Sequence, residues 1–218
     1  MSSLIILNEQ QGSDAWLKAR LGVITASNAH ALLLAKNSKT PKYKEARETY
    51  MFQLINEICT GQHEEINAKA LEWGKLNEDA AIAAYELISG KEVEKISLVY
   101  KDESRRAGAS ADFRLVGQNH GGECKCPING INHLNFILEG EIKDEYMTQM
   151  QFGMFCTGWD FWDFTSYNPR MPKKMLHYVT IERDLELMSY FDYEVPKFIY
   201  EMDQKLAQLG FKFGDQWK

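Results

Sequence analysis

The feature that most constrains the fold is a short segment near the middle of the chain that indicates a β-hairpin. The runs "RAGASADFRLVG" and "GGECKCP" are both strand-like, and the turn signals of "GQNHGG" separate them. In a strand, successive side chains point to opposite faces. We therefore expect Glu123 and Lys125 on one face and Cys124 and Cys126 on the other, with Pro127 ending the strand.

The cysteines indicate neither a disulfide framework nor a metal–thiolate centre. They are too few and too irregularly spaced for a framework, and a C-x-C pair does not suit a C-x-x-C redox or zinc half-site. Buried thiols are common small hydrophobic side chains, so we expect the hairpin pair to pack in the core. The four residues are Cys59, Cys124, Cys126 and Cys156.

The rest of the chain predicts helices on both sides of a small sheet. Its 218 residues can form one sizeable core but are short for two full domains, and no internal repeat is present. The order of elements predicts one α/β or α+β domain. Apolar spacing predicts helices near 45–61, 68–90, 143–158 and 184–210, with breaks at Gly74 and Pro196, and further strands near 94–103, 159–169 and 176–183.

Net charge and apolar content limit the classes of partner. The formal net charge of −6 argues against bulk attraction to nucleic acid, although a local basic groove stays compatible with it. No apolar run is long enough to cross a bilayer, so no membrane partner is expected. The amino terminus lacks the pattern of a secretion signal, and together with the cysteine usage this predicts a reduced, cytoplasmic protein.

The hairpin carries a set of charges that suits phosphodiester hydrolysis. Asp112 lies in the first strand, and the turn could bring it beside Glu123. Two converging carboxylates repel each other unless a proton or a divalent cation lies between them, and oxygen ligands favour magnesium or manganese over zinc. Lys125 could orient water or stabilise charge on a phosphate. The alternative is an exposed hairpin with an ordinary ion pair, which this short pattern alone favours.

Over nearly its whole length, the chain resembles the YqaJ-type viral recombinases, the lambda exonuclease family of the PD-(D/E)xK nuclease superfamily. The matching segments occur in one order: "DAWLKARLGVITAS", "NAKALEWGKLNEDA", "ECKCP", "YMTQMQ", "YNPRM", "LHYV.IERD" and "FGDQW". The resemblance implies a single α/β domain over 1–218. It also implies a restriction-endonuclease-like fold, with a central mixed β-sheet flanked by helices.

The resemblance implies a Mg²⁺-dependent 5′→3′ exonuclease that acts on double-stranded DNA ends. Such an enzyme releases 5′-mononucleotides and leaves 3′ single-stranded tails for annealing-type recombination. Two Mg²⁺ ions are implied, with Mn²⁺ as a substitute. A ring-shaped homotrimer, a single-strand annealing protein as partner, and a phage or prophage gene expressed in a bacterial cytoplasm are implied as well.

The resemblance also assigns roles at the hydrolytic centre. Asp112 and Glu123 would be metal ligands, helped by the backbone carbonyl of Cys124, and Lys125 would position or activate the attacking water. Two helix residues would join them, Glu78 at or around the metal site and Gln149 beside the catalytic centre. The alternative for both is a solvated side chain on a helix.

Recognition of a DNA end is assigned to a second group of residues. Arg20, Ser27 and Ser110 would bind the terminal 5′-phosphate, because Arg presents a planar set of donors and hydroxyls complete the cradle. Leu71 would be an apolar wedge that separates terminal base pairs. Without the resemblance, Arg20 would be interpreted as a surface arginine, Ser27 as a helix cap and Leu71 as a core leucine. Local basic candidates for backbone contact are Lys36, Lys39, Lys42, Lys44, Arg170, Lys173 and Lys174.

The chain departs from the family pattern at the first strand. The usual "SPDG" is here "SADF", so Ala111 replaces a proline and Phe113 replaces a glycine beside Asp112. Two alternatives for the function stay open, and Phe113 bears on the second of them. One is a structure-specific endonuclease of the same fold, and the other is an inactive module that binds DNA ends in recombination.

Overall fold

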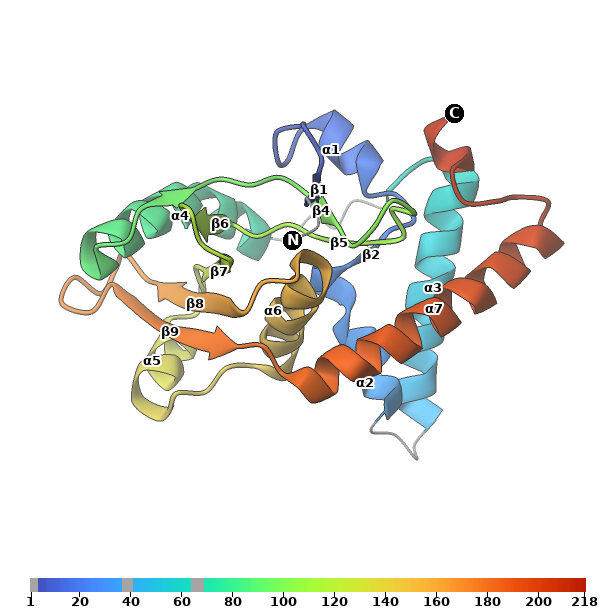
Figure 1. The fold of residues 1–218 in the computed structure, drawn as a ribbon. Coiled ribbons are helices and arrows are strands. Elements are labelled where there is room, and N and C mark those ends of the chain that lie inside the picture. Colours follow the sequence, from blue (N-terminus) through green and yellow to red (C-terminus); the bar gives the residue numbers. More distant parts are fainter. Residues whose placement is uncertain (1–3, 37–40, 64–68) are drawn as a thin grey trace.

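The computed structural model describes residues 4–36, 41–63 and 69–218, and it shows a mixed α/β fold (Figure 1). A five-stranded sheet occupies the middle of the fold, and its strands pair antiparallel except for β7 and β8, which are parallel. This confirms the expected mixed sheet. In spatial order its strands are β3 (Val93–Glu94), β6 (Phe113–Leu115), β7 (His120–Lys125), β8 (Phe161–Tyr167) and β9 (Leu176–Glu182).

The predicted hairpin is formed by β6 and β7. Phe113 pairs with Gly122 and Arg114 with Gly121, and the Asp112 N–H donates to the Gly122 carbonyl at 3.0 Å, which extends the pairing by one residue. The prediction of a hairpin here is confirmed, and it places Asp112 directly across from the strand that carries Glu123.

A second, smaller sheet was not expected. Its strands, in spatial order, are β1 (Ile5–Ile6), β4 (Val99–Tyr100), β5 (Ala107–Ala109) and β2 (Ile24–Thr25). The strand predicted near 94–103 is thus divided between two sheets, and the strand through 107–117 crosses from β5 in one sheet to β6 in the other. The crossing occurs at Ser110–Asp112, where the two sheets part.

Helices cover both faces of the five-stranded sheet. Tyr85 and Ile82 of α4 pack on one face with Phe113 and Tyr167, whereas Phe136 and Met150 pack on the other with Phe164. The connection from β7 to β8 runs through the helices of the second face, as parallel strands require. The helices around this sheet are α4 (Lys69–Ser89), α5 (Gly130–Glu139) and α6 (Asp144–Thr157).

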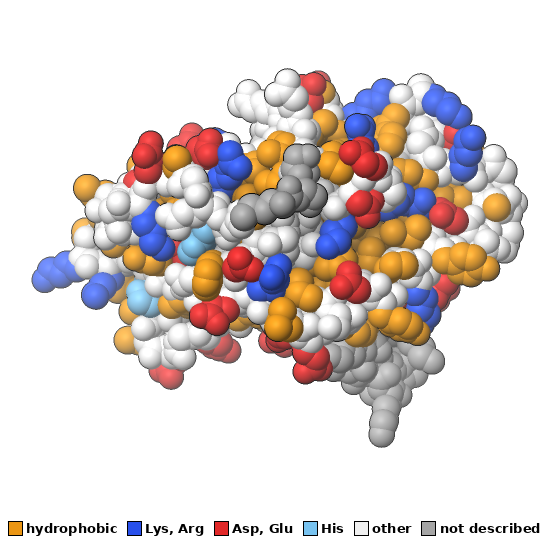
Figure 2. Space-filling view, in the orientation of Figure 1, with side chains coloured by type: hydrophobic (Ala, Val, Ile, Leu, Met, Phe, Trp, Pro, Cys, Tyr) orange, Lys and Arg blue, Asp and Glu red, His pale blue; other side chains and the backbone are white. Residues whose placement is uncertain are grey.

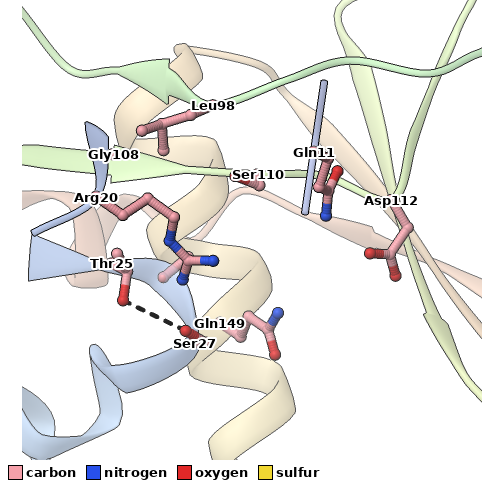
Figure 3. Close-up of a pocket in the computed structure, with 10 residues that line it drawn as sticks. Gln11, Arg20, Thr25, Ser27, Leu98, Gly108, Ser110, Asp112 and Gln149 are labelled. Atoms are coloured by element: carbon pink, nitrogen blue, oxygen red, sulfur yellow. Dashed lines mark hydrogen bonds between the residues drawn. The ribbon is translucent and has the colours of Figure 1, made fainter. Parts of the chain in front are cut away.

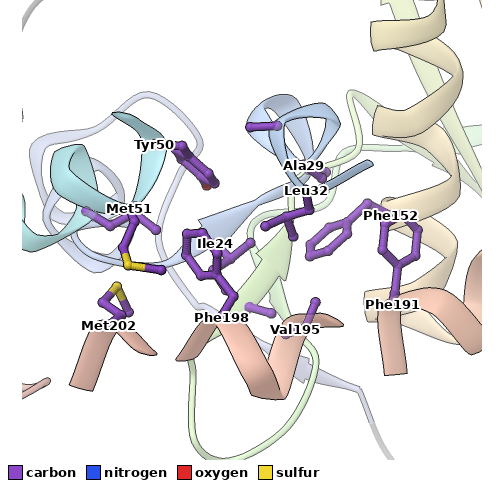
Figure 4. Packing of buried hydrophobic residues seen from close by; sticks show 14 of the residues in the cluster. Ile24, Ala29, Leu32, Tyr50, Met51, Phe152, Phe191, Val195, Phe198 and Met202 are labelled. Carbon is purple, nitrogen blue, oxygen red and sulfur yellow. The ribbon is translucent and has the colours of Figure 1, made fainter. Parts of the chain in front are cut away.

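The remaining helices build the other end of the molecule around the largest apolar cluster (Figure 4). There, Ile24 of the small sheet packs with Leu32, Met51 and Phe198, and the rings of Phe152 and Phe191 meet edge to face at 5.0 Å. Three of these helices surround that cluster, α2 (His30–Lys36), α3 (Pro41–Thr60) and α7 (Leu185–Gln208), with 3-10 turns at Ala26–Asn28 and Asp215–Trp217. The fourth, α1 (Asp14–Ala19), packs through Trp16 on a smaller cluster with Leu98 and Tyr100.

A local signal explains where α1 begins. The helix interruptions predicted at Gly74 and Pro196 are wrong. Ser13 caps α1 by accepting the Trp16 N–H at 3.2 Å. However, α4 continues through Gly74 and α7 continues through Pro196, which is exposed. A glycine costs only about 1 kcal/mol inside a helix, and the packed faces of these long helices outweigh such local costs.

Candidate active site

Four of the predicted catalytic residues lie together where β7 faces α6. Lys125 Nζ is 2.6 Å from Glu123 Oε1 and 3.2 Å from Gln149 Oε1, and Gln149 Nε2 donates to the same Glu123 oxygen at 2.8 Å. Asp112 lies across the hairpin, and its Oδ2 accepts the Cys124 N–H at 2.6 Å. The glutamate is nearly fully buried, with 4% of its side chain exposed, and the lysine has 27% exposed.

Tyr146 is a further member of this cluster. The Lys125 ammonium lies 4.6 Å from the centroid of the Tyr146 ring, one turn of α6 before Gln149, in a cation–π arrangement. The spacing of Tyr146 and Gln149 indicated a shared helix face, but the stacking on the lysine could not be inferred from it. Lys125 is therefore held on three sides, which leaves its ammonium little freedom to move.

The charges at this centre are unbalanced. Burial, followed by the negative charges of Glu123 and Glu78, raises the pKa of Asp112 well above its ordinary value. Burial also raises the pKa of Glu78. The pKa of Lys125 is raised, because the carboxylates of Glu123 and Asp112 outweigh the effect of its burial. Three carboxylates thus share the partly buried ammonium of Lys125. The exposed Lys95 is a further cation that interacts with Glu78 and Asp112, and added positive charge would stabilise this arrangement.

Glu78 approaches this centre from α4 without bonding to it. Its half-buried carboxyl interacts electrostatically with Glu123 and Lys125, but it forms no hydrogen bond or ion pair with any residue of the described ranges. The structure therefore brings Glu78 near the predicted site, and its role as a metal ligand or as a neighbour of the ligands stays a prediction.

The hairpin cysteines pack in the core, as expected. Cys124 and Cys126 contact the apolar cluster under α4, and the Thr165 hydroxyl donates to Cys124 Sγ at 3.0 Å. Burial raises the pKa of Cys126 to about 12 and raises the pKa of Cys124 as well, so both thiols stay protonated at neutral pH. The structure thus shows a packing role for both thiols, whereas the Cys124 carbonyl as a metal ligand stays a prediction.

Phe113 does not enter the site. Its ring is fully buried, stacks on Tyr85 with centroids 4.6 Å apart, and lies on the same face as the cysteines. Ala111 is also buried and packs on the opposite, α6-facing cluster. The two departures from the family pattern thus change core packing, and the Asp112 carboxylate remains beside Glu123.

The second predicted group lines a pocket that also contains Asp112 and Gln149 (Figure 3). The Arg20 side chain reaches into the pocket with Ser27 and Gln149 near its guanidinium, and Asp112 lies on the other side of the pocket. The pocket therefore joins the hydrolytic centre to all three candidates for the terminal phosphate, which come from α1, a 3-10 turn and the crossing between the sheets.

The donors of this pocket are largely without partners. The Arg20 guanidinium stacks on Trp16 at 4.2 Å from the ring centroid, and burial lowers its pKa, yet it forms no hydrogen bond or ion pair with any residue that the structure describes. The buried Ser110 hydroxyl also has no partner, and Ser27 Oγ meets only Thr25 Oγ1 at 3.3 Å. A desolvated cation beside spare hydroxyls is suited to bind an anion.

Two further polar side chains line the pocket that the sequence did not single out for binding. Gln11 lies in the loop before α1, and Thr25 precedes the 3-10 turn with its hydroxyl beside Ser27. A lone glutamine before Gly12 carries no pattern that marks it, so only the folded chain shows that its carboxamide faces the site.

Some predicted contacts lie outside the described residues or are engaged elsewhere. Leu71 falls in the first turn of α4, but its side chain is outside the described part, as are the side chains of Lys36, Lys39, Lys42 and Lys44. Arg170 donates to the Ile128 carbonyl at 2.7 Å and stacks on Trp73. Its contact with DNA stays a prediction, as do those of the exposed Lys173 and Lys174.

Asp112 and Glu123 together fit a divalent cation. Within the described ranges, no three His, Cys, Asp or Glu side chains converge as a complete metal site. However, Asp112 Oδ1 and Glu123 Oε2 receive no hydrogen bond from any described residue. Mg²⁺ is commonly held by one or two carboxylates, with water and substrate phosphate oxygens completing the shell. The donor set matches this requirement.

The fold and the site together show a buried carboxylate–lysine cluster next to a pocket lined by an arginine and by hydroxyl groups, and comparisons with known proteins identify the family. The profile of the YqaJ-like viral recombinase domain matches residues 15–160. The chain belongs to this family, and the resemblance noted in the sequence is confirmed.

Solved structures extend the similarity to most of the chain. The alkaline exonuclease LHK-Exo of Laribacter hongkongensis is 34% identical with a TM-score of 0.80, over 91% of this chain and 96% of that one. LHK-Exo in complex with dAMP matches with a TM-score of 0.79, at 34% identity over 90% and 96%. A phage-related exonuclease of Haemophilus somnus 129PT, at 15% identity, 86% and 96% coverage and TM-score 0.65, shares the fold.

A curated relative covers a shorter region. The uncharacterized protein ExoD of Escherichia coli (strain K12) is 51% identical over 87 residues, which are 39% of this chain and all of ExoD. Together with the exonuclease structures, the family assignment supports a nuclease role for the chain. Among the described residues, no helix has the length and apolar content needed to span a membrane.

Proposed function

We propose that the chain is a divalent-metal-dependent 5′→3′ exonuclease that acts on double-stranded DNA ends. It would release 5′-mononucleotides and leave 3′ single-stranded tails. The observation that carries the proposal is the continuity of one pocket, in which Arg20, Ser27 and Ser110 adjoin Asp112 and Gln149. A terminal 5′-phosphate bound by the first group would place the adjacent phosphodiester beside the second.

Arg20 supplies selectivity for an end in this proposal. A phosphate monoester carries more charge than a diester inside the strand, so a desolvated guanidinium that forms no ion pair within the described residues binds the terminus better than the interior. The Ser27 and Ser110 hydroxyls would donate to the remaining phosphate oxygens. This supports an exonuclease over the endonuclease alternative.

Asp112 and Glu123 would hold Mg²⁺, with the Cys124 carbonyl as an additional ligand; two ions are proposed, and Mn²⁺ would substitute. When bound, such ions lower the pKa of the attacking water and neutralise charge on the scissile phosphate. Lys125, fixed by Glu123 and Gln149, orients the water and stabilises negative charge that develops on the phosphate oxygens. Gln149 keeps the Glu123 carboxylate in place through its carboxamide.

A labelled linear duplex tests the proposal. Wild-type protein with Mg²⁺ should release a 5′ label rapidly from the ends of a linear DNA and leave a closed circle intact. EDTA or Lys125→Ala should abolish release. Cutting of the circle would establish an endonuclease, and binding to ends without release would establish an inactive end-binding module.

The assembly and the biological setting are proposed from the family. We propose a homotrimeric ring around DNA and a single-strand annealing protein as partner, in the cytoplasm of a bacterial or phage-infected cell. Light scattering coupled to size exclusion should give three times the chain mass. A monomer at micromolar concentration, or no complex with an annealing protein encoded nearby, would contradict this part of the proposal.

A further inference from the structure

We propose that Asp163 is a positioning residue for the hydrolytic centre. Through Tyr85, it holds α4 in the axial position that brings Glu78 to Asp112 and Glu123. The proposal rests on the nuclease function above and concerns residues that lie outside the pocket of Figure 3.

Asp163 is the acceptor at the centre of a buried polar cluster. It lies in the middle of β8, its side chain is fully buried, and its Oδ2 accepts from the Tyr85 hydroxyl and from Lys91 Nζ at 2.8 Å. Its Oδ1 accepts from Thr180 Oγ1 at 2.5 Å and lies 3.0 Å from His120 Nε2. Burial acts to raise the pKa of Asp163, but these four groups together lower it, so the group is an anion at neutral pH.

The four groups come from four different segments of the fold. Tyr85 belongs to α4, Lys91 follows α4, Thr180 lies in β9 and His120 begins β7. A single buried carboxylate therefore joins the α4 helix to three neighbouring strands. Such a hydrogen-bonded charge fixes position more strictly than apolar packing, because losing one partner leaves a buried polar group unpaired.

Tyr85 transmits this fixed position along α4. Glu78, Ile82 and Tyr85 are spaced four and three residues apart, so they share one helix face. Ile82 and Tyr85 are buried against the sheet, and Glu78 lies at the half-buried end of the same stripe. The seven residues from Tyr85 to Glu78 span about 10 Å of rigid helix. A bond that anchors the tyrosine thus sets where the glutamate lies.

Such an anchor matters for Glu78, because the carboxylates of Asp112 and Glu123 repel it, whereas the exposed Lys95, which bonds to Asp79, attracts it without a hydrogen bond. The negative charge of Glu78 raises the pKa of Asp112, as that of Glu123 does, so the three carboxylates repel one another. Glu78 has no hydrogen bond or ion pair within the described part of the chain. Its place beside the hairpin therefore depends on the rest of α4, where Tyr85 on the same helix face bonds to the buried Asp163 carboxylate.

Tyr85 also contacts the hairpin itself. Its ring stacks on Phe113, with centroids 4.6 Å apart, and Phe113 directly follows Asp112. Tyr85 thus contacts Phe113, which is next to Asp112, and it belongs to the same helix as Glu78. The hydroxyl and the ring have separable roles, which allows a sharp test.

The test compares two substitutions that each remove one hydroxyl donor to Asp163. Tyr85→Phe removes the donor on α4 and keeps the ring, whereas Thr180→Val removes the donor on β9 and leaves α4 untouched. We expect Tyr85→Phe to lower kcat for nucleotide release on the order of 10-fold, with KM for DNA ends unchanged, because catalytic groups become slightly misplaced. Thr180→Val should keep kcat within about 2-fold of the wild type.

A double substitution shows whether the effect acts through Glu78. In a Glu78→Gln background, Tyr85→Phe should cause little further loss of kcat, since the group it positions has already been removed. Hydrogen exchange of the α4 amides around Glu78 should quicken in Tyr85→Phe and stay unchanged in Thr180→Val. If the Tyr85 hydroxyl only stabilised the fold, Tyr85→Phe would not lower kcat at unchanged KM. Its effect on kcat would also be the same with Glu or Gln at position 78.

Equal kcat values for the two hydroxyl variants, or a full effect of Tyr85→Phe in the Glu78→Gln background, would overturn the proposal. Wild-type protein that releases no nucleotide from any DNA would instead contradict the proposed nuclease function. Hydrogen exchange, which needs no activity, then decides the positioning role: unchanged exchange around Glu78 in Tyr85→Phe would refute it.

Discussion

The Phe113 ring fills the space that a side chain at position 122 on the neighbouring strand would need. Phe113 and Gly122 are direct partners in the β6–β7 register, and a Cβ atom at position 122 would lie 2.0 Å from the Phe113 ring. The ring that replaces the family's usual glycine is accommodated because the partner strand has no side chain there. The sequence showed the unusual phenylalanine, but the compensating glycine was evident only once the register was known.

This pairing predicts that Gly122→Ala destabilises the fold. The added methyl group must displace the fully buried Phe113 ring, and overpacking of this kind costs about 1–3 kcal/mol. Chemical denaturation measures the change. Gly74→Ala is the control, since a Cβ there meets no atom within 4 Å, and a helical alanine should stabilise by roughly 1 kcal/mol. Equal stability of Gly122→Ala and the wild type would contradict the packing argument.

The raised pKa of Asp112 predicts the pH dependence of stability without metal. Burial and the neighbouring carboxylates raise this pKa above its ordinary 3.8, so the folded state binds the proton more tightly than the unfolded state. The stabilisation that this proton gives is complete below the ordinary pKa and is lost as pH rises through the folded value. In EDTA, melting temperature should fall as pH rises above about 4, and less steeply in Asp112→Asn. Parallel curves for the two proteins would refute the assignment.

At the scale of elements, the crossing between the two sheets assembles the site. β5 ends in the small sheet and β6 begins in the large one, and the three residues between them carry both the Ser110 hydroxyl and the Asp112 carboxylate. A continuous strand was predicted through this segment. Strand patterns record which residues are extended but not which sheet they join, so the division could not be predicted from local sequence.

Arg20, at the end of α1, lines the same pocket as Ser110 of the crossing, so Arg20→Ala should weaken the selectivity for phosphorylated DNA ends. Removing the only guanidinium that lines the described pocket should reduce the preference for 5′-phosphoryl over 5′-hydroxyl ends roughly 10-fold, since a hydrogen bond to a charged group contributes about 1.5–3 kcal/mol. Competition between the two kinds of duplex measures this preference.

Lys18→Ala provides the matched control for Arg20→Ala. Lys18 is an exposed cation in the last turn of the same helix and does not line the pocket. It should leave the preference unchanged, whereas an equal loss in both variants would indicate that only the total charge of α1 matters.

At the scale of the whole molecule, local charge matters more than net charge. The chain carries a net charge of −6, and Figure 2 shows Lys and Arg interspersed with Asp and Glu over the face in view. The concentration of charge lies instead in the site, where carboxylates gather on one side of the pocket and Arg20 lies on the other. A divalent cation bound in this one small region should therefore stabilise the whole fold.

Mg²⁺ should raise the melting temperature of the wild-type protein by several degrees. A cation bound only to the folded state stabilises it by about 2.7 kcal/mol at a concentration one hundred times its dissociation constant. Glu123→Gln should remove most of this gain, whereas Glu139→Gln, at the exposed end of α5, should retain it. Differential scanning fluorimetry checks the expectation, and an undiminished gain in Glu123→Gln would place the cation elsewhere.

Whether a contact could be predicted from the sequence depends on how far apart in the chain its two residues lie. The hairpin, its two faces and the packing of the cysteines depend on neighbouring residues, and these predictions are confirmed. The cluster around Asp163 joins residues 72 and 78 positions apart, and Gln11 reaches the site from an unpatterned loop. Such contacts depend on the packed fold and leave no local signal.

The shared space of Phe113 and Gly122 also limits the order in which the two positions can have changed during evolution. With a side chain at 122 and the ring at 113, the hairpin would contain a clash, and with glycine at both it would contain a cavity. A cavity is the milder defect where the surroundings can close around it. A lineage with glycine at 113 and a side chain at 122 would therefore have its most accessible route through an intermediate with two glycines.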